Sequence, residues 1–278
     1  VRAASSGVTL LTTGAATVAA DLEAPGAATA IVDAERPSHV FNLAGYGVDR
    51  GEADEVRAEQ LNHLLPRELA AACAPRGNAS GPVLVHVGSA AEYGSVGGTF
   101  TESGDARPFT TYGRTKLAGT RAVSEVAVGR GTRALTARLF TVFGEGEHEG
   151  RLFPSLVAAA AAGGPIDLSD GRQRRDFAFV GDVADALIAL GDLPVPPGDV
   201  VNVASGQLHT VEAFVRAAAV ALGMPESHLR FGTLPTRNDE MAHDGVSVDR
   251  MRSRLGHALT ADLDDMVRRA IADSGRPA

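Results

Sequence analysis

A tyrosine and a lysine four residues apart carry the strongest chemical signal in this chain. Lys116 is the single lysine among 26 basic residues, and it follows Tyr112 by four positions. On a helix, residues i and i+4 lie one turn apart on the same face. A phenol ordinarily ionises at about pH 10, and a neighbouring cation lowers its pKa. The pair therefore predicts a tyrosine that exchanges a proton with an alcohol or a ketone.

The stretches around this pair alternate between short apolar runs and helix-forming segments. The runs that predict strands are 8–11, 17–22, 40–44, 83–87 and 134–139, and the segments that predict helices are about 52–73 and 112–129. Short apolar strands separated by helices are typical of an α/β fold with a parallel sheet covered on both faces. In such sheets ligands bind beyond the carboxyl ends of the strands, so the partners of Tyr112 are expected there.

Ser89 lies at that edge, because it follows the strand predicted at 83–87. A hydroxyl there can donate a hydrogen bond to a substrate carbonyl or alkoxide beside Tyr112. The alternative is an ordinary turn serine in the glycine-bracketed stretch 88–94, but the downstream Tyr112 and Lys116 favour the catalytic role. The three side chains predict one half of a hydride-transfer site, and a nicotinamide would be the other half.

Composition restricts the class of protein. With 278 residues, 44% of them hydrophobic, the chain can form one large domain or two unequal ones. A net charge of −8 without a basic run argues against a nucleic-acid surface. No apolar run predicts a membrane span or a signal peptide, and the single cysteine, Cys73, excludes an internal disulfide and is expected to serve packing in a cytoplasmic protein. No cluster has metal-ligand spacing.

Several short motifs, taken in order, resemble the extended short-chain dehydrogenase/reductase family, which includes nucleotide-sugar epimerases, dehydratases and ketoreductases. The matching stretches are Asp21-Leu22, 42–45, Asn62, the triplet Ser89, Tyr112 and Lys116, and the stretches 138–144, 173–177, 180–183, 202–206 and 237–240. The resemblance implies a Rossmann-type, doubly wound parallel sheet over 1–142 plus 178–203. It also implies a smaller C-terminal lobe for a nucleotide sugar over 143–177 plus 204–278.

The resemblance assigns roles residue by residue. The catalytic residues it implies are Ser89, Tyr112 and Lys116. The cofactor contacts it implies are Asp21, Leu22, Leu43, Ala44, Gly45, Asn62, Val87, Tyr112, Lys116 and Leu139. The substrate contacts it implies are Ser89, Ala90, Thr141, Arg151, Leu152, Arg175 and Arg237.

The same resemblance implies the small molecules and the assembly. The cofactor is NAD(P)H, and NADP is favoured over NAD because Thr12-Thr13-Gly14, after the second strand, offers no acid to a ribose. The partner is a nucleotide diphosphate sugar, whose phosphates suit the planar guanidinium groups of Arg175 and Arg237. A homodimer is expected through the helices at 52–73 and 112–129.

One departure from the family concerns the start of the chain. The family begins with a strand and a glycine-rich turn that holds the pyrophosphate on a helix N-terminus, and the printed sequence has no such turn. The stretch 1–6 resembles the end of the following helix and 8–11 the second strand. We expect the first strand and the turn to precede the printed residues. The alternative is a binding or scaffold protein on a reductase fold without a phosphate cradle.

The residues after Ser89 bear on the reaction. Dehydratases of this family carry an Asp-Glu pair there for elimination, whereas this chain has Ala90 and Ala91. Dehydration is therefore not expected, and Glu92, one place further on, is expected to point away. The stretches 145–152 and 231–237 resemble 4-keto-6-deoxysugar reductases more than 4-epimerases. A 4-ketoreductase is favoured, and a 4-epimerase using the same triplet is the alternative.

Overall fold

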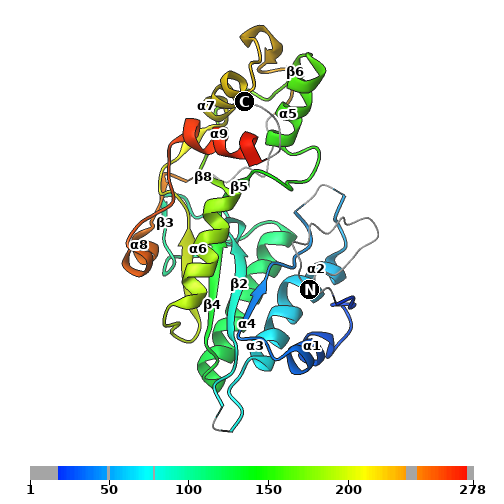
Figure 1. Cartoon of the computed structure of the whole chain (residues 1–278), viewed down its shortest axis with the longest axis vertical. Helices are drawn as coiled ribbons and strands as arrows, with labels where there is room; N and C mark the ends of the chain where they lie inside the picture. The colour runs from blue at the N-terminus through cyan, green and yellow to red at the C-terminus, as the bar shows by residue number, and fades with distance from the viewer. Residues whose placement is uncertain (1–17, 49–50, 78, 236–242, 274–278) are drawn as a thin grey trace. The chain divides into compact units, whose positions relative to one another are not determined.

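The computed structural model describes residues 18–48, 51–77, 79–235 and 243–273 (Figure 1). By its internal contacts the chain divides into two units. Unit 1 comprises Val1–Gly94, Ala106–Arg138 and Gly191–Val200, and unit 2 comprises Ser95–Asp105, Leu139–Leu190 and Val201–Ala278. The expected strand at 8–11, the stretch 12–14 and Arg237 lie outside the described residues.

The main sheet has the strand order β1-β2-β4-β9, and its strands are β1 His39–Asn42, β2 Val83–Ser89, β4 Ala134–Leu139 and β9 Asp199–Val203. β1 and β2 pair in parallel, with Val40 opposite Leu84. The predicted strands at 40–44, 83–87 and 134–139 are thus present within a few residues. The α/β fold expected from the alternation of strands and helices, which the resemblance implies to be Rossmann-like, is confirmed.

The other elements of unit 1 are helical: α1 Ala27–Glu35, α2 Glu55–Glu59, η1 Gln60–Leu64, α3 Leu65–Ala72, η2 Ala90–Glu92 and α4 Thr111–Arg130. α4 begins where Thr110 caps it, with Thr110 Oγ1 accepting from Gly113 N at 3.0 Å, and it ends at Gly131. α3 packs against both α1 and α4 (Figure 1). These helices and β2 enclose the core of unit 1, which includes Leu61, Leu65, Leu84 and Val123.

The predicted helix at 52–73 is interrupted by a π-helical turn, η1. Asp54 caps its start by accepting hydrogen bonds from Val56 N and Arg57 N. Pro66 has no N–H to donate to the carbonyl of Asn62 four residues earlier, which favours a wider turn there. The turn places Asn62, fully buried, in the middle of η1.

Unit 2 contains α5 Leu152–Ala162, α7 Val211–Ala221, η3 Glu226–His228, α8 Asp249–Leu255 and α9 Leu263–Asp273, and α6 Val180–Asp192 ends in unit 1. Its short strands are β3 Thr99–Phe100, β5 Thr141–Phe143, β6 Ile166–Asp167, β7 Arg174–Arg175, β8 Phe177–Phe179, β10 His209–Thr210, β11 Leu229–Arg230 and β12 Gly245–Val246. The core of unit 2 includes packed rings of Phe143, Phe153, Phe177 and Phe214.

Two sequence expectations differ from the structure. The strand predicted at 17–22 is wrong for its described part, because Val18–Asp21 has no regular structure and Leu22 lies in a turn. There Asp21 accepts backbone hydrogen bonds from Glu23 and Ala24, which are turn bonds. The division into units also places 95–105, 139–142, 178–190 and 201–203 in unit 2, and β5 pairs there with β8. The assignment of the units to cofactor and substrate stays a prediction.

Candidate active site

The three predicted catalytic side chains come from neighbouring elements of unit 1. Ser89 is the last residue of β2, Tyr112 lies in the first turn of α4, and Lys116 lies one turn later. Tyr112 is half-buried, and Lys116 is only 3% exposed. The Nζ atom of Lys116 donates a hydrogen bond to the backbone oxygen of Val87 at 2.5 Å, so the ammonium lies against the end of β2.

The hydroxyl of Ser89 has a defined orientation. Its Oγ accepts a hydrogen bond from Ala91 N at 3.2 Å, and the carboxylate of Glu92 accepts one from Ser89 N at 2.8 Å. These reciprocal bonds form a capping box at the start of η2. Since the oxygen of Ser89 already accepts a backbone N–H, its hydrogen can be donated to a ligand.

Close packing holds this serine turn against α4. A Cβ on Gly113, next to Tyr112, would lie 2.4 Å from the carbonyl oxygen of Ala91. A side chain at position 113 would therefore displace η2 from α4. On the other side of Lys116, a Cβ on Gly119 would lie 2.0 Å from the carbonyl oxygen of Asn62. The two glycines let η1 and η2 approach the helix that carries the Tyr112–Lys116 pair.

The electrostatics of Lys116 follow from its burial. Desolvation lowers the pKa of the ammonium from 10.5 to about 8, and the negative charge of Glu92 opposes that shift. The pKa of His86, buried within β2, is held well below 6.5, first by burial and then by the charge of Lys116. An ammonium with a pKa near neutrality is chemically unusual, and such groups concentrate at functional sites.

Replacing Lys116 with methionine is expected to change how stability depends on pH. The lysine has a pKa of about 8 when folded against 10.5 when unfolded, so between these values the unfolded chain binds more protons. The folded wild-type protein therefore gains stability as pH rises through this window, by about 3 kcal/mol relative to Lys116→Met. Urea titrations of both proteins below and above the window would measure the difference. A difference that does not change with pH would contradict a buried ammonium.

A loop after β1 lies against the same side chains. A Cβ on Gly45 would lie 3.4 Å from Asn62 Oδ1 and 3.9 Å from Lys116 Nζ, and one on Gly47 would lie 3.6 Å from the ring of Tyr112. Gly47 also has a φ of 98°, which side-chain-bearing residues rarely adopt. The loop therefore approaches Tyr112 and Lys116 closely and leaves space in front of the ammonium.

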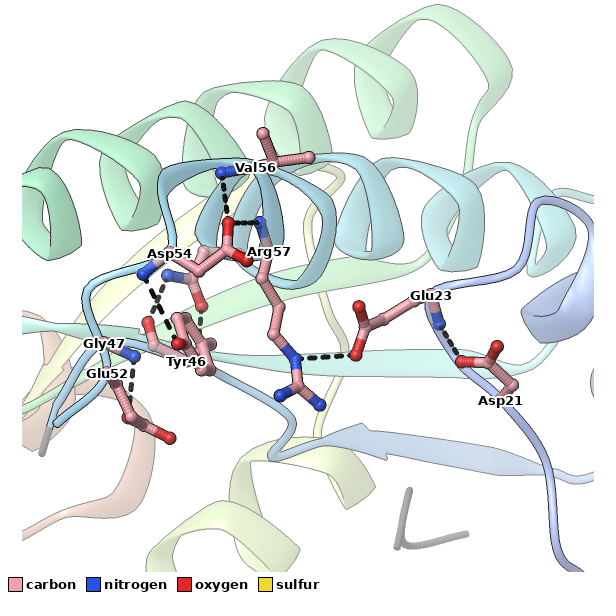
Figure 2. A network of polar contacts seen from close by, with 9 residues as sticks. Asp21, Glu23, Tyr46, Gly47, Glu52, Asp54, Val56 and Arg57 are labelled. Atoms are coloured by element: carbon pink, nitrogen blue, oxygen red, sulfur yellow. Dashed lines mark hydrogen bonds and ion pairs between the residues drawn. The ribbon is translucent and has the colours of Figure 1, made fainter. Parts of the chain in front are cut away.

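Hydrogen bonds fix the loop in this position. Asn62 Nδ2 donates to Tyr46 O at 2.7 Å and to Thr115 Oγ1 at 2.9 Å, and Asn62 Oδ1 accepts from Tyr46 N at 3.0 Å. Figure 2 shows the continuation of the network, in which Glu52 accepts from Gly47 N at 2.8 Å. Asn62 thus organises the loop through the backbone of Tyr46.

A cavity of about 730 Å³ opens beside the loop, a size suited to a small molecule or cofactor. Among the residues predicted to contact a cofactor, Leu22, Leu43, Ala44 and Gly45 line it. Its wall also includes the Arg57–Glu23 ion pair at 2.7 Å, shown in Figure 2. The structure thus brings these four residues together around one cavity.

Two further cofactor candidates have backbone or local roles. The carboxylate of Asp21 accepts a hydrogen bond from Glu23 N at 3.0 Å (Figure 2). Val87 supplies the carbonyl that binds Lys116.

Cys73, expected to serve packing, is buried, and burial raises the pKa of its thiol to about 11.

The remaining candidates belong to unit 2. Leu139, Thr141, Arg151, Leu152 and Arg175 all lie there. Thr141 N donates to Asp176 O at 2.9 Å, and Arg151 Nε donates to Glu147 at 3.3 Å. Leu152 begins α5 and packs against the aromatic core. The cofactor role of Leu139 and the substrate roles of the other four stay predictions, as does that of Ala90, which is buried at the start of η2.

Sequence reasoning missed the partner of Glu92. Glu92 is fully buried, and its second carboxylate oxygen accepts from Arg138 Nε at 2.8 Å. The guanidinium of Arg138 lies over the ring of Tyr93 at 4.5 Å. A charged residue inside the apolar run 134–139 was the available signal that a buried counter-charge must exist. The expectation that Glu92 points away from the substrate stays a prediction.

Comparisons with known proteins agree with this geometry. Residues 2–204 match the sequence model of the NAD dependent epimerase/dehydratase family. A dTDP-6-deoxy-L-talose 4-dehydrogenase (NAD(P)(+)) of Kitasatospora kifunensis is 34% identical over 222 residues, which cover 75% of this chain and 67% of that protein. A "Probable dTDP-4,6-dihydroxy-2-methyloxan-3-one 4-ketoreductase" of Streptomyces antibioticus is 33% identical over 177 residues, which cover 63% of this chain and 56% of that protein.

Solved structures share the fold. The structure of MoeE5 in complex with UDP-glucuronic acid and NAD matches with a TM-score of 0.79 and 26% identity, covering 93% of this chain and 85% of that chain. The chain spans 67% and 56% of the lengths of the two curated relatives. Among the described residues, no helix is long and apolar enough to cross a membrane. No group of three or more His, Cys, Asp or Glu in that part of the chain could hold a metal ion.

Proposed function

This chain belongs to the NAD dependent epimerase/dehydratase family, and on that premise we propose that it is an NAD(P)H-dependent 4-ketoreductase of a nucleotide diphosphate 4-keto-6-deoxysugar. The observation that carries the proposal is the buried ammonium of Lys116, one helical turn from Tyr112 and bonded to the strand that ends at Ser89. The names of the two relatives, a 4-dehydrogenase and a 4-ketoreductase of dTDP-sugars, support the substrate class.

The proposed reaction converts a ketone to an alcohol. Bound NAD(P)H supplies the hydride that adds to the carbonyl carbon. The hydroxyl of Ser89, held by Ala91 N, donates a hydrogen bond to the carbonyl oxygen, and the phenol of Tyr112 donates its proton to the same oxygen. The ammonium of Lys116 stabilises the phenolate that remains on Tyr112.

The residues present fit the nicotinamide end of such a cofactor. Gly45 leaves open the space in front of Lys116 Nζ and Asn62 Oδ1 that a side chain would fill. Within the described residues, the ammonium donates one hydrogen bond, to Val87 O, so two of its three donors remain for ribose hydroxyls. The proposed cofactor wall is Leu22, Leu43, Ala44 and Gly45. We propose that the protein prefers NADP to NAD, and this rests only on the absence of an acidic residue at 12–14.

The substrate in this proposal is a nucleotide diphosphate sugar. Thr141, Arg151, Leu152, Arg175 and Arg237 are its proposed contacts in addition to Ser89 and Ala90. The carboxylate of Asp176, next to Arg175, accepts hydrogen bonds from Ser205 N at 2.9 Å and Gly206 N at 2.8 Å. These bonds tie the residue after Arg175 to the backbone at 205–206. The proposed role of Arg175 is to bind a phosphate through its planar guanidinium.

The ion pair of Glu92 favours reduction over dehydration. An elimination needs a carboxyl group that can transfer a proton at the sugar, and the one nearest to Ser89 is bonded to Ser89 N and Arg138 instead. A 4-epimerase would use the same triplet without net consumption of cofactor. A non-catalytic binding protein would have no use for a buried lysine whose pKa is lowered to about 8.

Incubation with reduced cofactor separates these functions. NADH or NADPH is mixed with the protein and a panel of dTDP- and UDP-linked 4-keto-6-deoxysugars, and the nicotinamide absorbance is followed. We expect stoichiometric oxidation of NAD(P)H with one of them. Interconversion of 4-hydroxy epimers without net oxidation would identify an epimerase instead, and cofactor binding without either reaction would identify a binding protein.

A homodimer remains a proposal, and the structure narrows the surface that could form it. Most apolar residues of α3 and α4, such as Leu65 and Val123, are buried in the core of unit 1. Leu64, 42% exposed, borders a surface hollow between these helices, and Val128 on α4 is 71% exposed. We expect light scattering at micromolar concentration to give a dimer mass and Leu64→Glu to give a monomer. A monomeric wild-type protein would contradict the proposal.

We also propose a cytoplasmic location. Cys73 is the single cysteine of the printed chain, and its thiol is buried. This use of cysteine is typical of proteins from reducing compartments. Fractionation of the source cells is expected to recover the protein with cytoplasmic markers, and recovery with envelope or secreted fractions would contradict it.

A further inference from the structure

We propose that Glu92 is a positioning residue of the site: held by Arg138, its carboxylate fixes the backbone of Ser89 and supplies the negative charge that acts on Lys116. The inference rests on the proposed function, because it concerns the same proton-transfer residues. Glu92 itself is not expected to touch substrate. Its two oxygens are bonded to Ser89 N and to Arg138 Nε.

The residues packed around Glu92 leave space for its carboxylate. A Cβ on Gly88 would lie 2.6 Å from Glu92 Oε1 and 2.8 Å from Thr136 Cγ2. Glycine at position 88 therefore provides the space through which the carboxylate reaches back to Ser89 N. The contact fixes the end of β2 while the hydroxyl of Ser89 is oriented by Ala91 N. Loss of the carboxylate would release one of the two bonds that define the serine turn.

Arg138 makes a buried carboxylate tolerable. Glu92 is fully buried, and an unpaired charge there would carry a large desolvation cost. The guanidinium, itself 5% exposed, binds the carboxylate at 2.8 Å and stacks on Tyr93. Burial acts to lower the pKa of Arg138, but the negative charge of Glu92 outweighs it, so the pKa is raised and the guanidinium stays charged.

The same charge acts on the catalytic ammonium. The charge of Glu92 of η2 acts on Lys116, and Lys116 in turn acts on His86 of β2. Tyr112 lies one turn earlier on the same helix, and Arg138 of β4 is bonded to Glu92. His86 is neutral, since burial holds its pKa well below 6.5. Glu92 is therefore the anionic side chain that keeps the pKa of Lys116 at about 8 instead of lower. This preserves the cation beside Tyr112 at neutral pH.

The single lysine makes a direct test possible. Among the printed residues, labelling with ¹³C at the lysine ε-carbon gives one resonance, that of Lys116, whose chemical shift follows its protonation. We expect a pKa of about 8 in the wild-type protein and a value about 1 unit lower in Glu92→Gln, because a facing negative charge is removed. Glu102→Gln is the matched control, since Glu102 also accepts a backbone N–H, from Asn202 at 3.0 Å, but lies in unit 2.

A double variant keeps the test possible if Glu92→Gln does not fold. Glu92→Gln leaves Arg138 without its counter-charge, whereas Glu92→Gln/Arg138→Met removes both charges and keeps the volume. Replacing a buried ion pair by neutral side chains of similar size is often tolerated. We expect a lowered Lys116 pKa in this double variant also, because Glu92 is the charge that raises it. An unchanged Lys116 pKa in the folded double variant would overturn the inference.

Turnover supplies the second readout. In Glu92→Gln or the double variant we expect kcat to fall about 10-fold with KM nearly unchanged, and the alkaline limit of kcat to move to lower pH. If the wild-type protein turns over no nucleotide 4-keto sugar but the Lys116 pKa still falls in the variants, the proposed function is refuted. The effect of the Glu92 charge on Lys116 would then still hold. Normal turnover together with an unshifted resonance in the variants would refute the positioning role alone.

Discussion

Tyr112→Phe is expected to lower kcat for the ketosugar by about 1,000-fold, within the range for the loss of a positioned acid. The reason is that no other group is expected to deliver the proton when hydride adds. The phenylalanine ring keeps the packing of the tyrosine ring, which lies 3.6 Å from the Cβ position of Gly47. Binding of the reduced cofactor is therefore expected to change little.

The measurement pairs turnover with binding. Nicotinamide absorbance gives kcat, fluorescence of the reduced cofactor gives its Kd, and thermal unfolding reports the fold. Loss of turnover with wild-type cofactor affinity and an unchanged melting temperature would establish Tyr112 as the acid. Turnover within a few-fold of wild type would remove Tyr112 from that role.

Lys116→Arg is expected to lower kcat/KM by at least about 100-fold, although the substitution keeps the positive charge. Lys116 is buried, its Nζ lies 2.5 Å from Val87 O, and the Cβ position of Gly45 is 3.9 Å away. A planar guanidinium is larger and does not fit this space as a compact ammonium does. Overpacking of this kind costs about 1–3 kcal/mol, so we expect weaker cofactor binding and a lower melting temperature.

The chain provides the reverse exchange as a control. Arg130 lies exposed at the end of the same helix, so Arg130→Lys is expected to be nearly silent, within about 0.5 kcal/mol. Steady-state kinetics, cofactor titration and thermal unfolding of both variants complete the comparison. Full activity in Lys116→Arg would show that the identity of this residue carries no catalytic information.

The features that sequence reasoning predicted well depend on local geometry. Tyr112 and Lys116 share a helix face because they are four residues apart, and Thr110 marks the start of that helix. Ser89 lies at the sheet edge because an apolar run ends there. The strand predicted at 17–22 failed for a local reason as well, since Asp21 forms turn hydrogen bonds that the apolar pattern does not reveal.

Other features depend on residues far apart in the chain. The partner of Glu92 is Arg138, 46 positions later, and neither residue indicates the other by spacing. Asn62 holds the loop at Tyr46 from within a π-helical turn, and Gly119 lets α4 come close to that turn. Residue types suggested Asn62 as a candidate, but its hydrogen bonds follow from how α4 and η1 pack.

By itself, the sequence determined the chemical identity of the proposed site. A lone lysine one turn after a tyrosine and a serine at a strand end specify which groups meet, because helix periodicity and strand ends are local properties. Only the tertiary structure decided the pKa of the lysine. Lys116 has a pKa of about 8 because packing removes water from it and places Glu92 within electrostatic reach. Burial and facing charge are properties of the packed molecule, so no pattern along the chain could give them.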